Sequence, residues 1–228
     1  MIPCWISPVK MRYNILIIMS YLVLVRHGLS EYNKQGLWAG WADPALTPEG
    51  IEEAKKAGEV LKDIHFDYAY TNVLQRCIDT LEEIKKVLGQ TNLPTVQNKA
   101  INERNYGDFT AKNKWQIKEQ LGEEEFLKLR RSWDYPVPNG ESLKQVYERE
   151  IPYFEAEILP KLKEGKNILI SSSGNSLRAL VKYLENIPDD QIANLEIGTG
   201  EVYVYDLDEN GKVLKKETRT LNPMAGKV

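Results

Sequence analysis

The chain has 228 residues, a length that fits one α/β domain better than two. Hydrophobic residues make up 42% of it and charged residues 28%, which excludes a largely disordered chain. The formal net charge of −3, from 30 basic and 33 acidic residues, argues against a general nucleic-acid binder, and two cysteines exclude a disulfide framework and fit a cytoplasmic protein.

An apolar run extends from Tyr13 to Val25 near the N-terminus. It is shorter than the ~20 apolar residues of a transmembrane helix, and no small-residue cleavage site follows it, so we expect neither a membrane anchor nor a signal peptide. Its second half, residues 21–25, is better explained as a buried parallel strand. We therefore interpret residues 1–18 as an N-terminal appendage and residues 19–228 as one domain.

Apolar runs of strand length then alternate with helical patterns, which is typical of βαβ units on a mostly parallel sheet. Thr47 and Pro48 predict the start of a helix, and Asn72 predicts the cap of the next one. Residues 112–131 are charged and helical in pattern, and a long helix that Pro152 should kink is predicted over 141–162. The predicted strands are 21–25, 66–70, 94–99 and 167–171, and a helix is predicted over 176–184.

The C-terminal part predicts a β-hairpin over residues 201–207 and 213–217, with Asn210-Gly211 as a type I′ turn. The spacing of acidic residues over 206–217 also matches a calcium-binding loop, but such a loop needs flanking helices, so no metal site is predicted. The expected fold is a three-layer α/β domain. Its sheet is mixed and mostly parallel, with helices on both faces.

The strongest local motif is Arg26-His27-Gly28, directly after the first predicted strand. In open α/β sheets, ligands bind beyond the carboxyl ends of the strands. An imidazole at that place can act as a nucleophile, and Arg26 can hold an anion beside it. Taken alone, however, His27 is better explained as an ordinary surface histidine at a strand end.

Three further strand ends carry polar motifs. Arg76 follows the second predicted strand, Glu103 follows the third, and Ser173-Gly174-Asn175 follows the fourth. Each motif alone is better explained as a solvated charge or a turn. Because parallel strands end at the same edge of a sheet, together they predict an anion site with a nucleophile and a carboxylic acid.

These stretches resemble the 2,3-bisphosphoglycerate-dependent phosphoglycerate mutases of the histidine phosphatase superfamily. The resemblance covers residues 20–207. Arg-His-Gly marks only the superfamily, whereas Glu103-Arg-Asn-Tyr-Gly, Lys114 and the pair Arg130-Arg131 mark the mutase branch more narrowly. The matching segments are LVLVRHGLSEYN, GLWAGWADPALTPEG, FDYAYTNVLQRCIDTL, INERNYGDFTAKNK, LRRSWD, NGESL and SGNSLRALVKYLENI.

The resemblance implies interconversion of 2- and 3-phosphoglycerate in glycolysis and gluconeogenesis. It implies a phosphohistidine at His27, primed by 2,3-bisphosphoglycerate without a metal, with Arg26 and Arg76 holding the phosphoryl group and Glu103 as general acid and base. It also implies a cytoplasmic homodimer that binds small phosphoglycerates, not nucleic acid or membrane. The implied substrate contacts are Ser30, Asn33, Ala39, Gly40, Arg104, Asn105, Tyr106, Lys114, Arg130, Arg131, Gly174 and Asn175.

Several of these positions depart from the family pattern. Ser173 stands where the family has a second catalytic histidine, and the chain's other histidine, His65, lies in a turn before the second strand. A serine donates one hydrogen bond but carries no charge, so we expect turnover to fall by ~10²–10³. Leu29 replaces an acidic or polar residue, Ala39 a threonine, and Asn105 a histidine.

Two other functions remain open from the sequence. The first is a phosphatase in which water takes the phosphoryl group from His27, although the cationic residues Lys114, Arg130 and Arg131 disfavour it. The second is a catalytically silent protein that binds phosphosugars. Ser173, Leu29 and Ala39 favour this alternative, whereas the combination of a nucleophile and an acid disfavours it.

Overall fold

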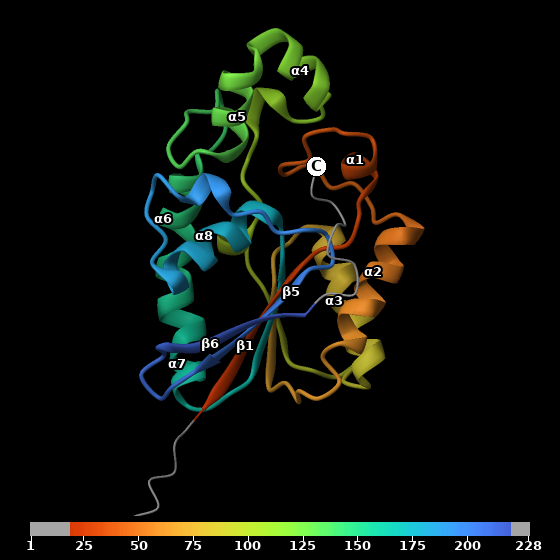
Figure 1. Ribbon diagram of the computed structural model, residues 1–228. Coiled ribbons are helices and arrows are strands. Elements are labelled where there is room, and N and C mark those ends of the chain that lie inside the picture. Colours follow the sequence, from red (N-terminus) through yellow and green to blue (C-terminus); the bar gives the residue numbers. More distant parts are fainter. Residues whose placement is uncertain (1–18, 220–228) are drawn as a thin grey trace, which may run out of the picture.

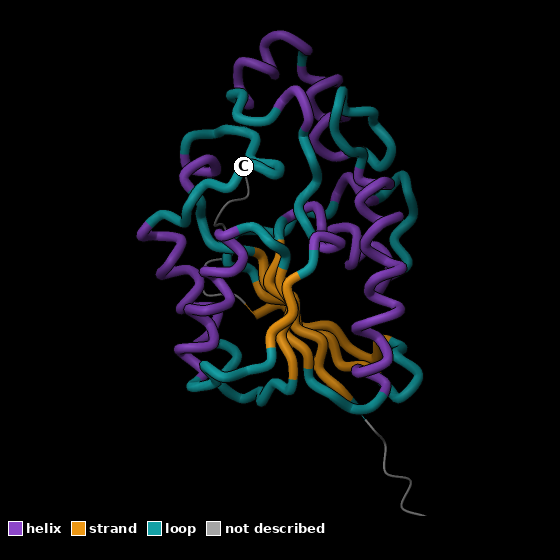
Figure 2. Tube along the Cα trace, turned by 180° about the vertical axis from the view of Figure 1, so that it is seen from behind, coloured by secondary structure: helices purple, strands orange, loops and turns teal. Residues whose placement is uncertain are grey.

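The computed structural model describes residues 19–219 and shows a six-stranded sheet with helices on both faces (Figures 1 and 2). The predicted appendage, residues 1–18, and residues 220–228 lie outside the described residues. The strand order is β3-β2-β4-β1-β5-β6, in which β3, β2, β4 and β1 are parallel, β5 is antiparallel to β1, and β6 is antiparallel to β5. The strands are β1 (Ser20–Arg26), β2 (Tyr68–Thr71), β3 (Thr95–Gln97), β4 (Ile168–Ser172), β5 (Val202–Leu207) and β6 (Val213–Arg219).

The helices form the outer layers of this α/β fold, and the predicted three-layer arrangement is confirmed. Every predicted strand is present, with ends that differ by no more than two residues. The helices are α1 (Glu31–Lys34), α2 (Pro48–Glu59), α3 (Gln75–Leu88), α4 (Lys114–Leu121), α5 (Glu123–Arg131), α6 (Leu143–Tyr153), α7 (Leu159–Lys163) and α8 (Gly174–Glu185). Within the described range, each helix is too short or too polar to cross a bilayer.

The two faces of the sheet carry separate parts of the core, as the alternation of side chains along β1 requires. Leu22 and Leu24 pack with α6, α7 and α8 on one face, through residues such as Leu162 and Leu177. Val23 and Val25 pack with α2 and α3 on the other. The central strand is therefore buried on both sides, and its carboxyl end is held firmly where the Arg-His-Gly motif begins.

The helix starts agree only partly with the sequence signals. Thr47 caps α2 as predicted, because its hydroxyl accepts a hydrogen bond from the N–H of Gly50 at 3.0 Å. The prediction for Asn72 is wrong: α3 begins at Gln75, and the Asn72 side chain instead accepts a hydrogen bond from the N–H of Leu74. Asn72 thus forms a turn ahead of the helix rather than its cap.

The two long helical segments are both interrupted. Residues 112–131 form two helices, because Gly122 takes φ 79° and ψ 165° between α4 and α5. The segment 141–162 begins at Leu143, after a capping box at Ser142, and contains Pro152 within α6. Its hydrogen bonding changes to the π pattern over Phe154–Ile158 before α7, next to the proline that lacks an N–H donor.

The turn of the C-terminal hairpin also differs from the prediction. A type I′ turn needs positive φ at both central residues, but of Asn210 and Gly211 only Gly211 has one, at 78°. The loop is longer: the N–H of Asp208 donates to Lys212 O, and the Asp208 carboxylate accepts from the N–H groups of Asn210 and Lys212. The carboxylate thus stabilises a wider turn.

Helices α4 and α5, here called the α4–α5 pair (residues 114–131), stand beyond the carboxyl ends of the strands (Figure 1). They rest on a hydrophobic cluster of their own, separate from the two core clusters of the sheet. This small cluster consists of Trp38, Tyr106, Ile117, Phe126, Leu129 and Val137.

Candidate active site

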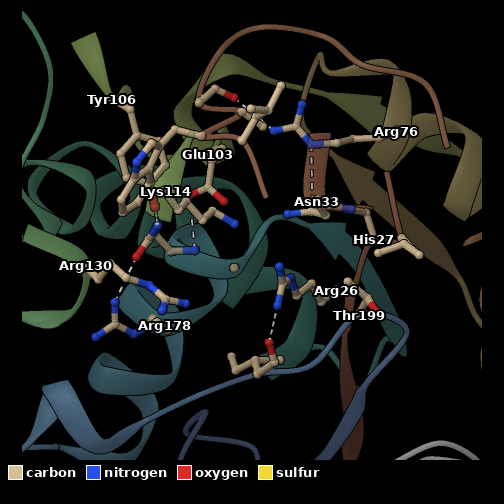
Figure 3. A pocket seen from close by; sticks show the side chains of 18 of the residues that line it. Arg26, His27, Asn33, Arg76, Glu103, Tyr106, Lys114, Arg130, Arg178 and Thr199 are labelled. Carbon is tan, nitrogen blue, oxygen red and sulfur yellow. Dashed lines mark hydrogen bonds between the residues drawn. The ribbon is translucent and has the colours of Figure 1, made fainter. Parts of the chain in front are cut away.

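A cavity of about 320 Å³ lies at the carboxyl ends of β1 and β4 (Figure 3). The α4–α5 pair contributes to its wall. Most predicted site residues line it: Arg26, His27, Asn33, Ala39, Gly40, Arg76, Glu103, Tyr106, Lys114, Arg130, Arg131, Gly174 and Asn175. Leu29, noted from the sequence as a departure from the family pattern, lines it too. Residues that the sequence interpretation missed also line it: Lys34, Leu37, Trp38, Arg178, Glu196, Ile197 and Thr199.

His27 follows the last residue of β1, and its side chain is only 3% exposed. Its Nδ1 lies 2.7 Å from the Gly28 carbonyl oxygen, which can only accept, so Nδ1 carries the proton. Nε2 therefore keeps its lone pair and accepts a hydrogen bond from Arg76 Nε at 3.2 Å. Burial, assisted by Arg76 and Arg26, holds the pKa of His27 well below its usual value. The imidazole is thus neutral at neutral pH, with Nε2 as its nucleophilic atom.

Arg76 lies in the first turn of α3 and is completely buried. Besides Nε2 of His27, its guanidinium contacts the loop before α2, donating from Nη1 to Ala42 O and from Nη2 to Gly40 O, both at 2.9 Å. The same side chain therefore orients the imidazole and fixes the loop that forms one wall of the cavity. In Figure 3 it lies directly beside the ring of His27.

The backbone after His27 is fixed by close contact with the start of α2. A Cβ at Gly28 would lie 2.1 Å from Gly50 O, and a Cβ at Gly50 would lie 2.1 Å from Leu29 O. Only glycine fits at either position. The N–H of Gly28 also donates to Thr80 Oγ1 at 3.1 Å, so α2 and α3 both hold this turn.

Arg26 extends from the end of β1 toward the start of α8. Its Nη1 donates to Ile197 O at 2.5 Å, and a Cβ at Gly174 would lie 3.5 Å from its Nε. Burial lowers the pKa of Arg26 below its ordinary value. The cationic side chain and the N-terminus of α8 thus lie close together, and both favour an anion.

Glu103 supplies the carboxylic acid of the site and is 8% exposed. Its Oε1 accepts hydrogen bonds from the N–H groups of Arg104 at 2.7 Å and Asn175 at 3.2 Å. Its own backbone carbonyl accepts from Trp41 Nε1 at 2.7 Å. The carboxyl group is therefore held in one orientation at the cavity wall.

A chain of hydrogen bonds joins α8 to the α4–α5 pair. Asn175 Nδ2 donates to the Tyr106 hydroxyl at 2.9 Å, and Arg178 Nη1 donates to Asn175 Oδ1 at 2.8 Å. Arg178 Nη2 also donates to Arg131 O at 2.7 Å, at the end of α5. The sequence does contain a signal for Arg178, because this residue lies three positions after Asn175, on the same face of a helix.

The α4–α5 pair brings three cations to the cavity, Lys114, Arg130 and Arg131. Burial lowers the pKa of Lys114 to about 8, with smaller contributions from the positive charges of Arg130 and Arg26. Arg131 forms an ion pair with Glu196 at 2.5 Å. Positive charge from these helices therefore complements that of Arg26 and Arg76, and the cavity can bind a ligand with two anionic groups.

Four predicted site residues do not line the cavity. Ser173 precedes α8 and is fully buried, but its Oγ lies 3.3 Å from Cys77 Sγ. The hydroxyl of Ser30 caps α1 and donates to Asn33 Oδ1 at 2.8 Å, so it orients a residue that does line the cavity.

The other two are Arg104 and Asn105. Arg104 is buried, stacks 4.5 Å over the Tyr106 ring and donates to Leu129 O at 3.0 Å. Asn105 Oδ1 accepts from the N–H of Gly107 at 2.9 Å. Both side chains thus hydrogen-bond to the protein backbone and do not line the cavity.

The model of branch 1 of the histidine phosphatase superfamily matches residues 22–220. The chain belongs to this superfamily. The 2,3-bisphosphoglycerate-dependent phosphoglycerate mutase of Parvibaculum lavamentivorans is 48% identical to it over 198 residues, which cover 86% of this chain and 94% of that protein. The phosphoglycerate mutase of Schizosaccharomyces pombe is 46% identical with the same coverage. Within the superfamily, the enzyme therefore belongs to the phosphoglycerate mutases, which confirms the predicted resemblance.

Two solved structures share the fold. A mycobacterial glucosyl-3-phosphoglycerate phosphatase superposes with a TM-score of 0.73 at 21% identity, covering 90% of this chain and 99% of that one. Phosphoglycerate mutase from Bacillus anthracis gives a TM-score of 0.66 at 23% identity, covering 90% and 93%. In the described part of this mutase-family chain, no group of three or more His, Cys, Asp or Glu side chains could hold a metal ion.

Proposed function

We propose that the enzyme interconverts 2- and 3-phosphoglycerate through a phosphohistidine at His27. One observation carries this proposal: a buried neutral imidazole presents Nε2 to a cavity that has cations on both sides. A phosphoglycerate has a phosphate and a carboxylate, and thus needs two cationic regions. Arg26 and Arg76 are the proposed partners of the phosphoryl group, and Lys114, Arg130 and Arg131 those of the other anionic end.

The proposed reaction starts from phosphorylated His27 and has two transfers. In the first, the free hydroxyl of 3-phosphoglycerate loses its proton to the Glu103 carboxylate and attacks phosphorus, while the P–N bond breaks and its electron pair returns to Nε2, which leaves the bisphosphate. In the second, Nε2 attacks the other phosphate, a P–N bond forms, the ester P–O bond breaks, and the departing oxygen takes the proton back from Glu103. Arg26 and Arg76 neutralise the charge on the phosphoryl oxygens in both directions.

The same arrangement fits 2,3-bisphosphoglycerate as a primer. Arg26, whose Nε is buried without a protein partner in the described chain, would hold one phosphate, and Lys114 and Arg130 would hold the other. When bound, this compound supplies the phosphoryl group that loads His27. A cytoplasmic location and assembly as a homodimer remain predictions from the family resemblance.

We also propose that this enzyme turns over more slowly than members of its family that have the second histidine. The Ser173 hydroxyl is buried next to Cys77 and is absent from the cavity lining, so it adds little to phosphoryl stabilisation. A missing donor of this kind lowers the rate by ~10²–10³. In the extreme case, the missing donor would leave an enzyme that transfers the phosphoryl group to water, as a phosphatase does, or a protein that binds its ligand without turnover.

The test is a coupled assay of 2-phosphoglycerate formation from 3-phosphoglycerate, with and without primer, together with acid-quench detection of phosphohistidine. We expect primer-dependent turnover and a phosphoenzyme, both lost in His27→Ala. Release of inorganic phosphate without 2-phosphoglycerate would favour the phosphatase. Salt-sensitive binding of 3-phosphoglycerate with neither product nor phosphoenzyme would favour the silent binding protein.

A further inference from the structure

Thr199 has an unusual place in the cavity wall. Its side chain lines the cavity although the residue is 2% exposed, and Oγ1 has no hydrogen-bond partner among residues 19–219. Buried hydroxyls nearly always have a partner, because leaving one without costs free energy. Figure 3 shows Thr199 next to Arg26, whose Nε is likewise buried and unpartnered in the described chain.

The loop that carries Thr199 is fixed to the end of β1. The N–H of Gly200 donates to Arg26 O, and the N–H of Arg26 donates to Glu201 O, both at 3.1 Å. The Glu201 carboxylate closes the loop by accepting from the N–H of Gly198 at 2.5 Å. These bonds hold Thr199 beside the residue that directly precedes His27, so its hydroxyl does not depend on a mobile loop for its position.

The unpartnered groups are of one chemical kind. Arg26 Nε is a donor, the Thr199 hydroxyl can donate, and the first turn of α8 beside Arg26 presents backbone N–H groups. Ionised phosphoryl oxygens only accept. A dianionic group at this place would therefore satisfy both buried side chains at once, whereas a neutral apolar ligand would satisfy neither.

Resting on the proposed function, we propose that Thr199 donates a hydrogen bond to the phosphoryl group in transit to and from His27. It would thereby replace part of the stabilisation that Ser173 does not give. The Ser173 hydroxyl is turned to Cys77 at 3.3 Å, so a hydroxyl from another part of the chain occupies the donor role. Sequence motifs alone did not suggest this residue, because it lies in the loop before β5 rather than at the end of a parallel strand.

The test compares Thr199→Val with Thr199→Ser, and uses Thr71→Val as the matched control. Thr71 is also fully buried with an unpartnered Oγ1, but it lies on β2 outside the cavity lining. We expect Thr199→Val to lower kcat and the affinity for vanadate, an analogue of the phosphoryl transition state, by ~10²-fold, with little change in KM. Thr199→Ser and Thr71→Val should stay within a few-fold of the unmodified enzyme.

Thermal melting separates this contact from a structural role. Without ligand, Thr199→Val should melt at the same temperature as the unmodified enzyme or higher, because no protein hydrogen bond is lost. With vanadate, its rise in melting temperature should be smaller. A lower melting temperature without ligand would overturn the inference, and so would unchanged kcat and vanadate affinity.

The proposed function and this inference fail in different ways. If the unmodified enzyme forms no 2-phosphoglycerate but vanadate still stabilises it, and less so in Thr199→Val, the mutase proposal fails and the Thr199 contact stands. If the enzyme turns over and Thr199→Val turns over equally fast, only the contact fails. An unmodified enzyme that vanadate does not stabilise at all would overturn both.

Discussion

The two sides of the cavity are built differently. At the strand ends, His27 and Arg76 are almost completely buried, and their hydrogen bonds join residues that are far apart in the sequence. On the α4–α5 pair, Lys114 and Arg130 are partly exposed and carry like charges, and burial lowers the pKa of each. The strand-end side is thus organised before a ligand arrives. The α4–α5 pair holds like charges whose repulsion a bound anion would reduce.

The hydrophobic clusters that support the two sides also differ, because those under the strand ends are larger. The strand ends rest on the two core clusters of the sheet, which include β1 and β4. The α4–α5 pair rests on the small cluster around Phe126 and Leu129. Small clusters open at lower free-energy cost than the main core. The comparison therefore predicts that changes at the strand ends affect chemistry, whereas changes at the α4–α5 pair affect binding.

The largest effect is expected at Arg76, which is hydrogen-bonded to His27 at the strand-end side of the cavity. Arg76→Lys cannot reach His27 Nε2, Gly40 O and Ala42 O together, so kcat should fall by ~10²–10³. Carbonyls left unpaired should also lower the free energy of unfolding by ~2 kcal/mol. Single-turnover phosphoenzyme formation and urea unfolding measure the two effects.

Arg219→Lys is the matched control for this change. Arg219 also binds a backbone carbonyl, that of Val60, and the carboxylate of Asp63, but it lies on β6 outside the cavity lining. Its replacement should leave kcat unchanged. Equal losses of kcat in both variants would mean that general destabilisation, rather than orientation of His27, explains the effect at Arg76.

An intermediate effect is expected from truncation of the small cluster. Phe126→Ala and Phe154→Ala remove the same side chain from two buried places, 2% and 0% exposed, in the small cluster and in the main core. Phe154→Ala should lower the free energy of unfolding by ~3–5 kcal/mol. Phe126→Ala should lower it less, but should speed amide hydrogen exchange over residues 114–131 and raise KM more than it lowers kcat. Equal global destabilisation by the two changes would show that the α4–α5 pair unfolds only with the sheet.

The smallest effect is a pH dependence of binding. Because the pKa of Lys114 is lowered to about 8, this lysine is mostly charged at pH 7 and mostly neutral at pH 9. Affinity for 3-phosphoglycerate should therefore fall about tenfold between these pH values, the effect of losing one favourable charge contact. Near pH 8, binding should take up a proton, which calorimetry in buffers of different ionisation enthalpy measures.

Lys114→Arg provides the control, because arginine stays charged throughout this range. Its affinity should vary little with pH, and the proton uptake should disappear. If the variant and the unmodified enzyme show the same fall in affinity, another group is responsible for it.

The same contrast explains what could be predicted from the sequence. Strand ends follow from apolar runs, and parallel strands share an edge, so the meeting of His27, Arg76 and Glu103 at one cavity was predictable. The direction in which each side chain points could not be predicted. Ser173 stands at the predicted strand end, yet its hydroxyl turns to Cys77, which is 96 positions away in the chain.

Other differences have the same physical origin. Asn72 has the side chain of a helix cap, but it pairs two residues ahead of α3, and its Nδ2 contacts Ser172 Oγ of β4 at 3.3 Å. Thr199 lies outside regular structure, and only the folding of its loop onto β1 brings it to the cavity. Local patterns predict the backbone, whereas the choice of partner depends on residues that only the tertiary fold brings near.

The fixed ring of His27 has one more consequence. Nδ1 is tied to the Gly28 carbonyl, and Gly28 is wedged against Gly50, so the imidazole cannot swing between two positions. In the proposed reaction, phosphorus therefore stays at a single point, and the two hydroxyls of glycerate must reach it in succession. The small molecule has to reorient inside a cavity of about 320 Å³ while the histidine ring stays in place. The substrates that this enzyme can isomerise are then those that can reorient within that volume without leaving it.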